Sequence, residues 1–108
     1  MRVKRIEVSQ IFSPWCGGRY RTDGAHSGEA FRDDILKPVL FDETYDIVIV
    51  DFRQCYGAPL SFLYEIFVGL TEDDRFNYEL LEKLRIYTFD NSEVFDIMVT
   101  MSECLGAR

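Results

Sequence analysis

The stretch YDIVIVDF, residues 45–52, decides the fold class of this 108-residue chain. Its centre, residues 47–50, consists of four β-branched side chains in a row. A continuous apolar run of this kind is typical of a strand that is covered on both faces, as in a sheet with crossover helices. We therefore expect an α/β protein in which this segment is the central strand.

The spacing of apolar residues on either side predicts the other elements. Further strands are expected at residues 3–12, 19–21 and 84–89. Helical spacing predicts helices at residues 27–40, 61–70, 77–84 and 91–106. Because strands and helices alternate, the strands must be joined by crossover connections, which are right-handed. The expected architecture is a mixed or parallel central sheet of about four strands with helices packed against it.

Local signals place the ends of these helices. Ser27 and Ser61 are expected as N-caps of the two helices that they precede. Pro38 should bend or interrupt the first helix near its end. Asp90, with Glu93 three residues later, resembles a capping box at the start of the last helix.

The composition indicates one domain spanning residues 1–108. Hydrophobic residues make up 47% of the chain, which excludes intrinsic disorder, and no apolar run reaches the roughly 18–20 residues of a membrane span. The basic start is not followed by an apolar segment, so we expect no signal peptide and a cytoplasmic protein. A net charge of −7 disfavours general binding to nucleic acid or anionic membranes. Residues 1–41 nevertheless carry seven basic and five acidic side chains, or +2.

Three widely spaced cysteines, Cys16, Cys55 and Cys104, are present. Their odd number argues against a disulfide framework, and the absence of a CxxC motif argues against structural zinc. Cys16 follows a strand in a half-match to a thioredoxin-type motif, but Arg19 stands where the second cysteine would be. We therefore expect no redox activity at Cys16, and we expect the other two cysteines to be partly buried apolar residues.

Other polar residues permit site hypotheses of lower weight. His26 lies close to Asp23 and Glu29, but a lone histidine in a polar loop is more typical of a surface residue than of a metal ligand. Asp51 and Asp90 both end predicted strands, where functional groups cluster in α/β sheets and where two carboxylates can divide acid and base roles. The simpler interpretation is that both are solvated strand ends or caps. No metal, cofactor or catalytic residue is expected.

Two segments of the chain carry a family resemblance. The first combines GRYRTDG at residues 18–24 with SGE and FR inside residues 27–32, and the second joins IVIVDF at residues 47–52 to SFLYEIFVGL at residues 61–70. Together they resemble the bacterial STAS-like domains of unknown function, which are named for their similarity to anti-sigma-factor antagonists. The resemblance implies a small cytoplasmic domain that binds a GHKL-type ATPase or protein kinase. In the antagonists this kinase phosphorylates a serine at the start of a helix that follows a central strand.

Transferred to this sequence, the resemblance implies a regulatory protein-interaction domain, with or without phosphate control. The helix start is marked by Ser61, preceded by Leu60 where the antagonists have a second serine. Phosphate at such a position adds close to two negative charges and can block an interface. The implied partner-binding residues are Tyr56, Gly57, Leu60, Ser61, Arg19, Tyr20, Arg21 and Asp23.

The glycine-rich loop, residues 17–29, supports an alternative function. Its arginines suit phosphates, and Tyr20 with the nearby Trp15 could stack on a base, so the protein could be a nucleotide or nucleic-acid sensor or a small phosphodiesterase-like enzyme. The structural alternative is that Arg19 and Arg21 pair with Asp23, Glu29 or Asp33 inside the domain and that the glycines serve turns. A purely structural subunit of a larger assembly is a third possibility.

Overall fold

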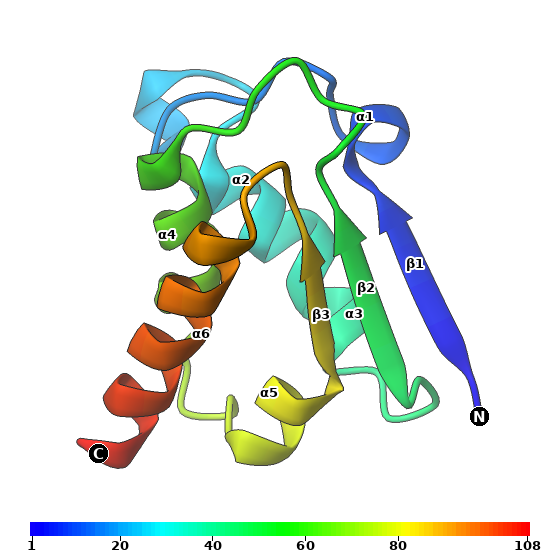
Figure 1. The fold of residues 1–108 in the computed structure, drawn as a ribbon, viewed down its shortest axis with the longest axis vertical. Coiled ribbons are helices and arrows are strands. Elements are labelled where there is room, and N and C mark those ends of the chain that lie inside the picture. The colour runs from blue at the N-terminus through cyan, green and yellow to red at the C-terminus, as the bar shows by residue number, and fades with distance from the viewer.

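Three parallel strands form the sheet, in the order β1-β2-β3 (Figure 1). In this computed structural model, which describes residues 1–108, β1 (Val3–Glu7) pairs with β2 (Ile47–Asp51), and β2 pairs with β3 (Leu84–Tyr87). The apolar run quoted above is therefore the central strand, as predicted. The expectation of about four strands is wrong, and the sheet is wholly parallel.

The missing strand is the one predicted at residues 19–21. The Asp23 carboxylate accepts hydrogen bonds from the backbone N–H groups of Arg19 (3.1 Å) and Tyr20 (2.9 Å). These bonds close a turn that continues as a 3₁₀ turn (Arg21–Asp23). A backbone that turns on itself in this way cannot extend along a sheet edge.

The first strand is shorter than residues 3–12. It stops at Glu7 because its partner ends at Asp51, which lies opposite Glu7 in the parallel register. The next residues form a single helical turn, α1 (Val8–Ile11), in which the Phe12 N–H donates to the Val8 carbonyl (3.0 Å). The three- and four-residue spacing of apolar side chains here suits a helical turn once the partner strand has ended.

The first crossover is one continuous helix in three parts. It consists of α2 (Gly28–Phe31), a π-helical turn (Arg32–Leu36) and α3 (Lys37–Leu40). Ser27 is its N-cap, as predicted, and accepts a hydrogen bond from the Ala30 N–H (3.1 Å). The π-helical turn ends two residues before Pro38, which lacks a backbone N–H, so the α-helical bonding is interrupted without ending the helix.

The second crossover contains α4 (Leu60–Leu70) and α5 (Tyr78–Lys83), and α6 (Asn91–Gly106) follows β3. The buried stripe of α6 is the predicted one, with Ile97, Met101 and Leu105 in the core. Asp90 caps this helix by accepting a hydrogen bond from the Ser92 N–H (2.9 Å). None of the helices combines the length and apolar character that crossing a bilayer requires.

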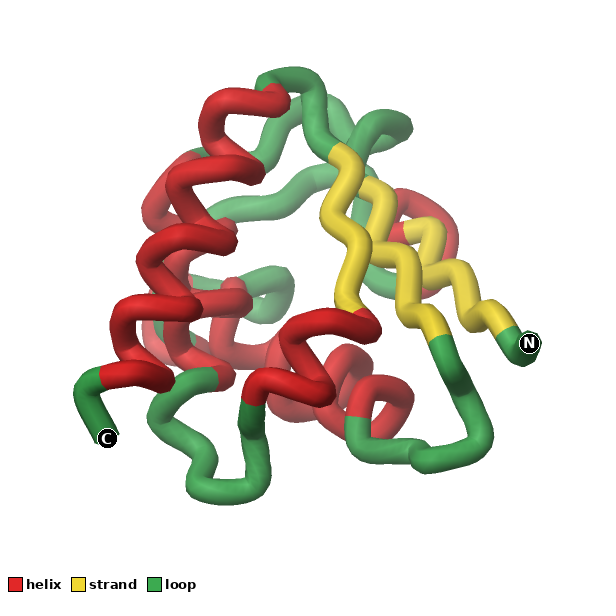
Figure 2. Tube along the Cα trace, turned by 60° about the horizontal axis from the view of Figure 1, so that its bottom comes forward, coloured by secondary structure: helices red, strands yellow, loops and turns green.

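The sheet buries only one of its two faces. Along β2, Val48 and Val50 are fully buried, whereas the intervening Ile47 and Ile49 are half-buried. Figure 2 shows the long helices on one side of the strands. Both crossovers step in the same direction across the sheet, and right-handed crossovers of this kind place their helices on one face. The predicted coverage of β2 on both faces is therefore wrong.

The core lies between the sheet and the helices and is rich in phenylalanine. Phe52, at the end of the central strand, contacts the rings of Phe31, Phe62 and Phe67, with centroids 5.9–6.1 Å apart. The first crossover approaches α4 closely at Gly28, where a Cβ atom would lie 2.7 Å from the Phe62 carbonyl oxygen. Glycine is required there because any side chain would separate the two helices.

Candidate functional site

The carboxyl ends of the three strands lie at one edge of the sheet because all strands are parallel. The segments that leave these ends therefore share one end of the molecule, the end to which the arrows in Figure 1 point. Most of the large apolar side chains that are exposed belong to these segments or border them. They are Ile11, Trp15, Tyr20, Tyr56, Leu60, Tyr87, Phe89 and Phe95.

Five members of this set, together with the neighbouring Ser61, are called the carboxyl-end surface. It consists of Trp15, Tyr56, Leu60, Ser61, Phe89 and Phe95. Aromatic side chains at the carboxyl edge of a parallel sheet occupy the place where α/β proteins most often carry their functional groups.

Two aromatic side chains of this surface are stacked on each other. The rings of Trp15 and Tyr56 lie 4.2 Å apart at their centroids with an interplanar angle of 23°. Both are mostly exposed, at 67% and 74%. The Tyr56 N–H donates to the Pro14 carbonyl (2.8 Å), and Trp15 forms a parallel bridge with Gly57. The loops that follow β1 and β2 therefore present the two rings as one platform.

Leu60 and Ser61 lie in the first turn of α4, and both are exposed. The predicted role of Ser61 as the N-cap is wrong. Pro59 holds the cap position, and its carbonyl accepts the first helical hydrogen bond from the Leu63 N–H (3.1 Å). Because the cap lies two residues earlier than expected, Ser61 falls within the first turn of the helix, where it is exposed and does not cap.

Phe89 and Phe95 are the residues of this surface that sequence reasoning missed. Phe89 is 70% exposed because β3 ends at Tyr87, two residues before it. Phe95 is 68% exposed and lies outside the apolar stripe of α6. That position was the available signal, since an aromatic residue off the buried face of an amphipathic helix is exposed.

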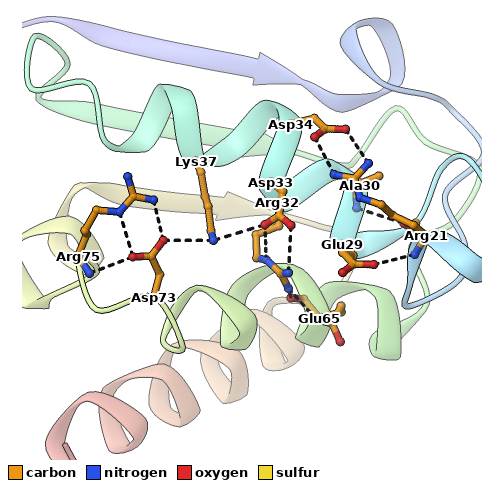
Figure 3. A network of polar contacts seen from close by, with 11 residues as sticks. Arg21, Glu29, Ala30, Arg32, Asp33, Asp34, Lys37, Glu65, Asp73 and Arg75 are labelled. Atoms are coloured by element: carbon orange, nitrogen blue, oxygen red, sulfur yellow. Dashed lines mark hydrogen bonds and ion pairs between the residues drawn. The ribbon is translucent and has the colours of Figure 1, made fainter.

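Both arginines of the glycine-rich loop pair with carboxylates of the domain, and Figure 3 shows the contacts of Arg21. The Arg21 guanidinium donates two hydrogen bonds to the Asp34 carboxylate (2.9 and 2.7 Å), and its backbone N–H donates to Glu29 (2.9 Å). The hydrogen bonds from Arg21 hold the pKa of Asp34 below its ordinary value. Arg19 faces Glu65 at 3.9 Å. Both arginines therefore pair inside the domain, but their side-chain partners are Asp34 and Glu65 rather than the predicted Asp23, Glu29 or Asp33.

The same network continues into the helices. Arg32, which is nearly buried, donates to the Glu65 carboxylate (2.6 Å) and carbonyl (2.8 Å) on α4 and to Asp33 (2.9 Å). Lys37 bridges Asp33 (3.4 Å) and Asp73 (3.2 Å). These contacts fasten the first crossover helix to α4 and to the turn after it, so their role is structural.

The backbone of the glycine-rich loop is also engaged. Gly18 has φ +82°, and a Cβ there would lie 2.8 Å from Cβ of Asp23. Its carbonyl accepts from the Gly28 N–H (3.0 Å). The hollow between this loop and α4 is lined by two glutamates beside a single arginine, which disfavours phosphate. Its lining residues are Arg19, Tyr20, Tyr64, Glu65, Val68, Gly69 and Glu72.

Each of the two strand-end carboxylates has its own structural partners. Asp51 is buried and accepts hydrogen bonds from the Arg53 side chain (2.9 and 3.0 Å) and backbone N–H (2.9 Å), and it also pairs with Arg5. Hydrogen bonding from Arg53 is the main reason that the pKa of Asp51 lies below its ordinary value. Asp90 caps α6. Nothing joins the two carboxylates into one acid–base site.

Neither His26 nor Cys16 has the surroundings of a catalytic or metal-binding residue. His26 is exposed and packs edge-on against Phe12, with ring centroids 5.4 Å apart. No group of three or more His, Cys, Asp or Glu side chains is arranged to hold a metal ion. Burial, followed by the neighbouring Cys55, raises the pKa of the Cys16 thiol to about 12. A thiol with so high a pKa is a weak nucleophile at neutral pH.

A comparison with known protein families finds a match that includes the first crossover helix and α4. The model of the STAS-like domain of unknown function (DUF4325) matches residues 27–93. The chain belongs to this family. The matched residues of the STAS-like domain run from the N-cap of α2 to the first turn of α6, and they include Tyr56, Ser61 and Phe89. No curated protein and no solved structure is significantly similar to the chain.

Proposed function

We propose that this STAS-like domain is a cytoplasmic regulatory module that binds a protein partner through its carboxyl-end surface. The observation that carries the proposal is the stacked pair of Trp15 and Tyr56, which is held by backbone bonds and left mostly exposed. Tyrosine and tryptophan dominate the energetics of protein interfaces, and exposed apolar patches on monomers mark interaction sites. Because backbone bonds already hold the two loops together, binding to the platform costs little conformational entropy.

The proposed partner is a GHKL-type ATPase or kinase, the class that the family resemblance implies. The start of α4 supports this choice because Leu60 supplies an apolar contact and Ser61 an exposed hydroxyl beside it. A phosphate on Ser61 would lie at a helix N-terminus, where free backbone N–H groups and the helix dipole stabilise it. The same charge would oppose the docking of an apolar surface on Leu60.

The test is capture of the partner by affinity purification from the native host, followed by calorimetry with the purified partner in the presence of ATP. Tyr56→Ala is expected to weaken binding about 30-fold, the effect of removing an interface hot spot. Tyr78→Ala is the matched control, since Tyr78 is an exposed tyrosine on α5 at the opposite end of the sheet. Equal losses in both variants, or binding unaffected by Tyr56→Ala, would place the interface elsewhere.

Phosphate control is tested with the same partner. Ser61→Asp is expected to weaken binding, whereas Ser61→Ala is expected to retain it. The free energy of unfolding of Ser61→Asp should rise by about 0.5 kcal/mol, because a negative charge in the first turn interacts favourably with the helix dipole. Equal partner affinities of Ser61→Asp and Ser61→Ala would remove phosphate control while leaving the interface intact.

A further inference from the structure

Two cysteines that are distant in the sequence meet beneath the platform of aromatic rings. Cys16 and Cys55 are 39 residues apart, and their Sγ atoms lie 3.8 Å apart. Both thiols also lie near the Ser13 carbonyl oxygen, at 3.4 and 3.6 Å. No disulfide joins them, and the third cysteine, Cys104, is on α6.

The two loops that carry these cysteines are already held together. The loop after β1 and the loop after β2 are joined by the bridge between Trp15 and Gly57 and by the hydrogen bond from Tyr56 to Pro14. Gly17 stands next to Cys16, and Gly57 lies two residues after Cys55. A Cβ atom at either glycine would have no other atom within 4 Å. The sulfur atoms need to approach from 3.8 Å to the bonding distance of about 2.05 Å. Backbone at such unhindered glycines can supply this movement.

We propose that Cys16 and Cys55 form a reversible disulfide when the protein meets a small-molecule disulfide such as oxidised glutathione. Cys16, the more exposed of the two, attacks the reagent as its thiolate and forms a mixed disulfide, releasing one reduced glutathione. Cys55 then attacks the Cys16 sulfur and releases the second. In total the protein loses two protons and two electrons, and one oxidised glutathione becomes two reduced molecules.

Because both thiols are mostly protonated at neutral pH, the first step is slow. The second step takes place within one molecule. Burial raises the pKa of both thiols, and at Cys55 the nearby carboxylates of Glu7 and Asp51 contribute to this. Little thiolate is therefore present at neutral pH. Once Cys16 carries a glutathione, however, Cys55 is in contact with it, and ring closure does not depend on a second collision.

The disulfide would connect the loop that carries Trp15 directly to the loop that carries Tyr56. It is therefore a modification site inside the carboxyl-end surface. Its formation does not depend on the proposed partner, so the chemistry can be tested on the isolated protein and fails or succeeds separately from the proposed function.

The experiment exposes the folded Cys104→Ser protein to excess oxidised glutathione and follows its intact mass. Closure of the pair lowers the mass by about 2 Da, since two hydrogens are lost, and peptide mapping should join Cys16 to Cys55. Cys55→Ser in the same background is the control, because it can only accumulate the mixed disulfide at Cys16. The closed form should melt at a higher temperature than the reduced form, because the cross-link restricts the unfolded chain.

Several results would overturn the proposal. The first is a stable mixed disulfide in the protein that retains both cysteines, which would show that Cys55 cannot reach Cys16. The second is a protein whose thiols remain unmodified at a glutathione poise that oxidises a control dithiol peptide. The third is a cross-link that appears only in denaturant, because it would then belong to the unfolded chain. Melting of the closed form at a lower temperature would also contradict the fit of the disulfide to the native loops.

Discussion

The glycine-rich loop and the carboxyl-end surface differ in whether their side chains find partners within the domain. In the loop, arginines meet carboxylates of the same domain, with Arg21 bonded to Asp34 and Arg19 facing Glu65. On the surface, Trp15 and Tyr56 have only each other for ring contact and remain mostly exposed. The loop is thus internally complete, and the surface is not.

The difference shows that a high density of unusual residues does not by itself indicate a binding site. The loop combines glycines, arginines, a tyrosine and a histidine, and its polar groups serve its own conformation. The surface is inconspicuous in the sequence because its aromatic residues come from three separate segments. What distinguishes it is the absence of partners within the fold, which only the folded chain reveals.

The largest expected effect concerns Arg32, which joins the first crossover helix to α4. Arg32→Ala should lower the free energy of unfolding by about 3 kcal/mol, because the nearly buried Glu65 carboxylate loses the cation closest to it. Urea denaturation measures the change. A loss below about 1 kcal/mol would show that the network is not structural and would weaken the contrast between the two regions.

Next in size is the effect of Trp15 on partner binding. Trp15→Ala should reduce affinity for the captured partner about 30-fold, or about 2 kcal/mol, because it removes half of the platform. Its cost in folding stability should be only about 1 kcal/mol, the value of an exposed aromatic pair. Calorimetry and urea denaturation of the same samples separate the two quantities. A stability loss larger than the binding loss would mean that the stack is mainly structural.

The buried carboxylate of Asp51 supports the same edge of the sheet and makes its stability depend on pH. Arg53 holds the pKa of Asp51 below its ordinary value, so the folded state favours the ionised form. This stabilisation is complete above pH values of about 4–5 and is lost as pH falls through the lowered pKa.

Asp51→Asn should therefore lower the free energy of unfolding by about 1–2 kcal/mol at pH 7, and the gap to wild type should narrow at pH 3. Urea denaturation at both pH values is the measurement. A constant gap across this range would show that the carboxylate's charge contributes nothing and that only its shape matters.

The smallest effect is expected at Arg21, whose ion pair with Asp34 is exposed to solvent. Arg21→Ala should leave the Tm unchanged, because exposed ion pairs contribute little in water. Addition of nucleotides should raise the Tm of neither the variant nor the wild type, since a ligand stabilises only a protein that binds it. A nucleotide-dependent rise in the wild type that disappears in Arg21→Ala would reverse the comparison and move the function to the loop.

Much of the architecture could be predicted from local patterns. The central strand, the cap at Ser27 and the buried stripe of α6 follow from side-chain spacing and capping chemistry, which act over a few residues. The predicted strand at residues 19–21 failed because the Asp23 side chain offered the backbone a competing set of hydrogen bonds. The predicted cap at Ser61 is wrong because Pro59 takes the cap position two residues earlier.

Part of the candidate site could also be predicted from local patterns. Tyr56, Leu60 and Ser61 were predicted from the segment that links β2 to α4, and the structure places all three at exposed positions. Phe89 and Phe95 were missed, since exposure depends on where β3 ends and on which face α6 buries.

The sequence alone determined that the chain is an α/β protein of the STAS-like family with β2 at its centre, because these properties follow from local periodicity and motifs. Only the tertiary structure decided that one face of the sheet stays open, that Trp15 stacks on Tyr56 and that Cys16 meets Cys55. These contacts join segments about forty residues apart. They depend on the order and direction of the strands, and local spacing carries no information about which loops will share an edge.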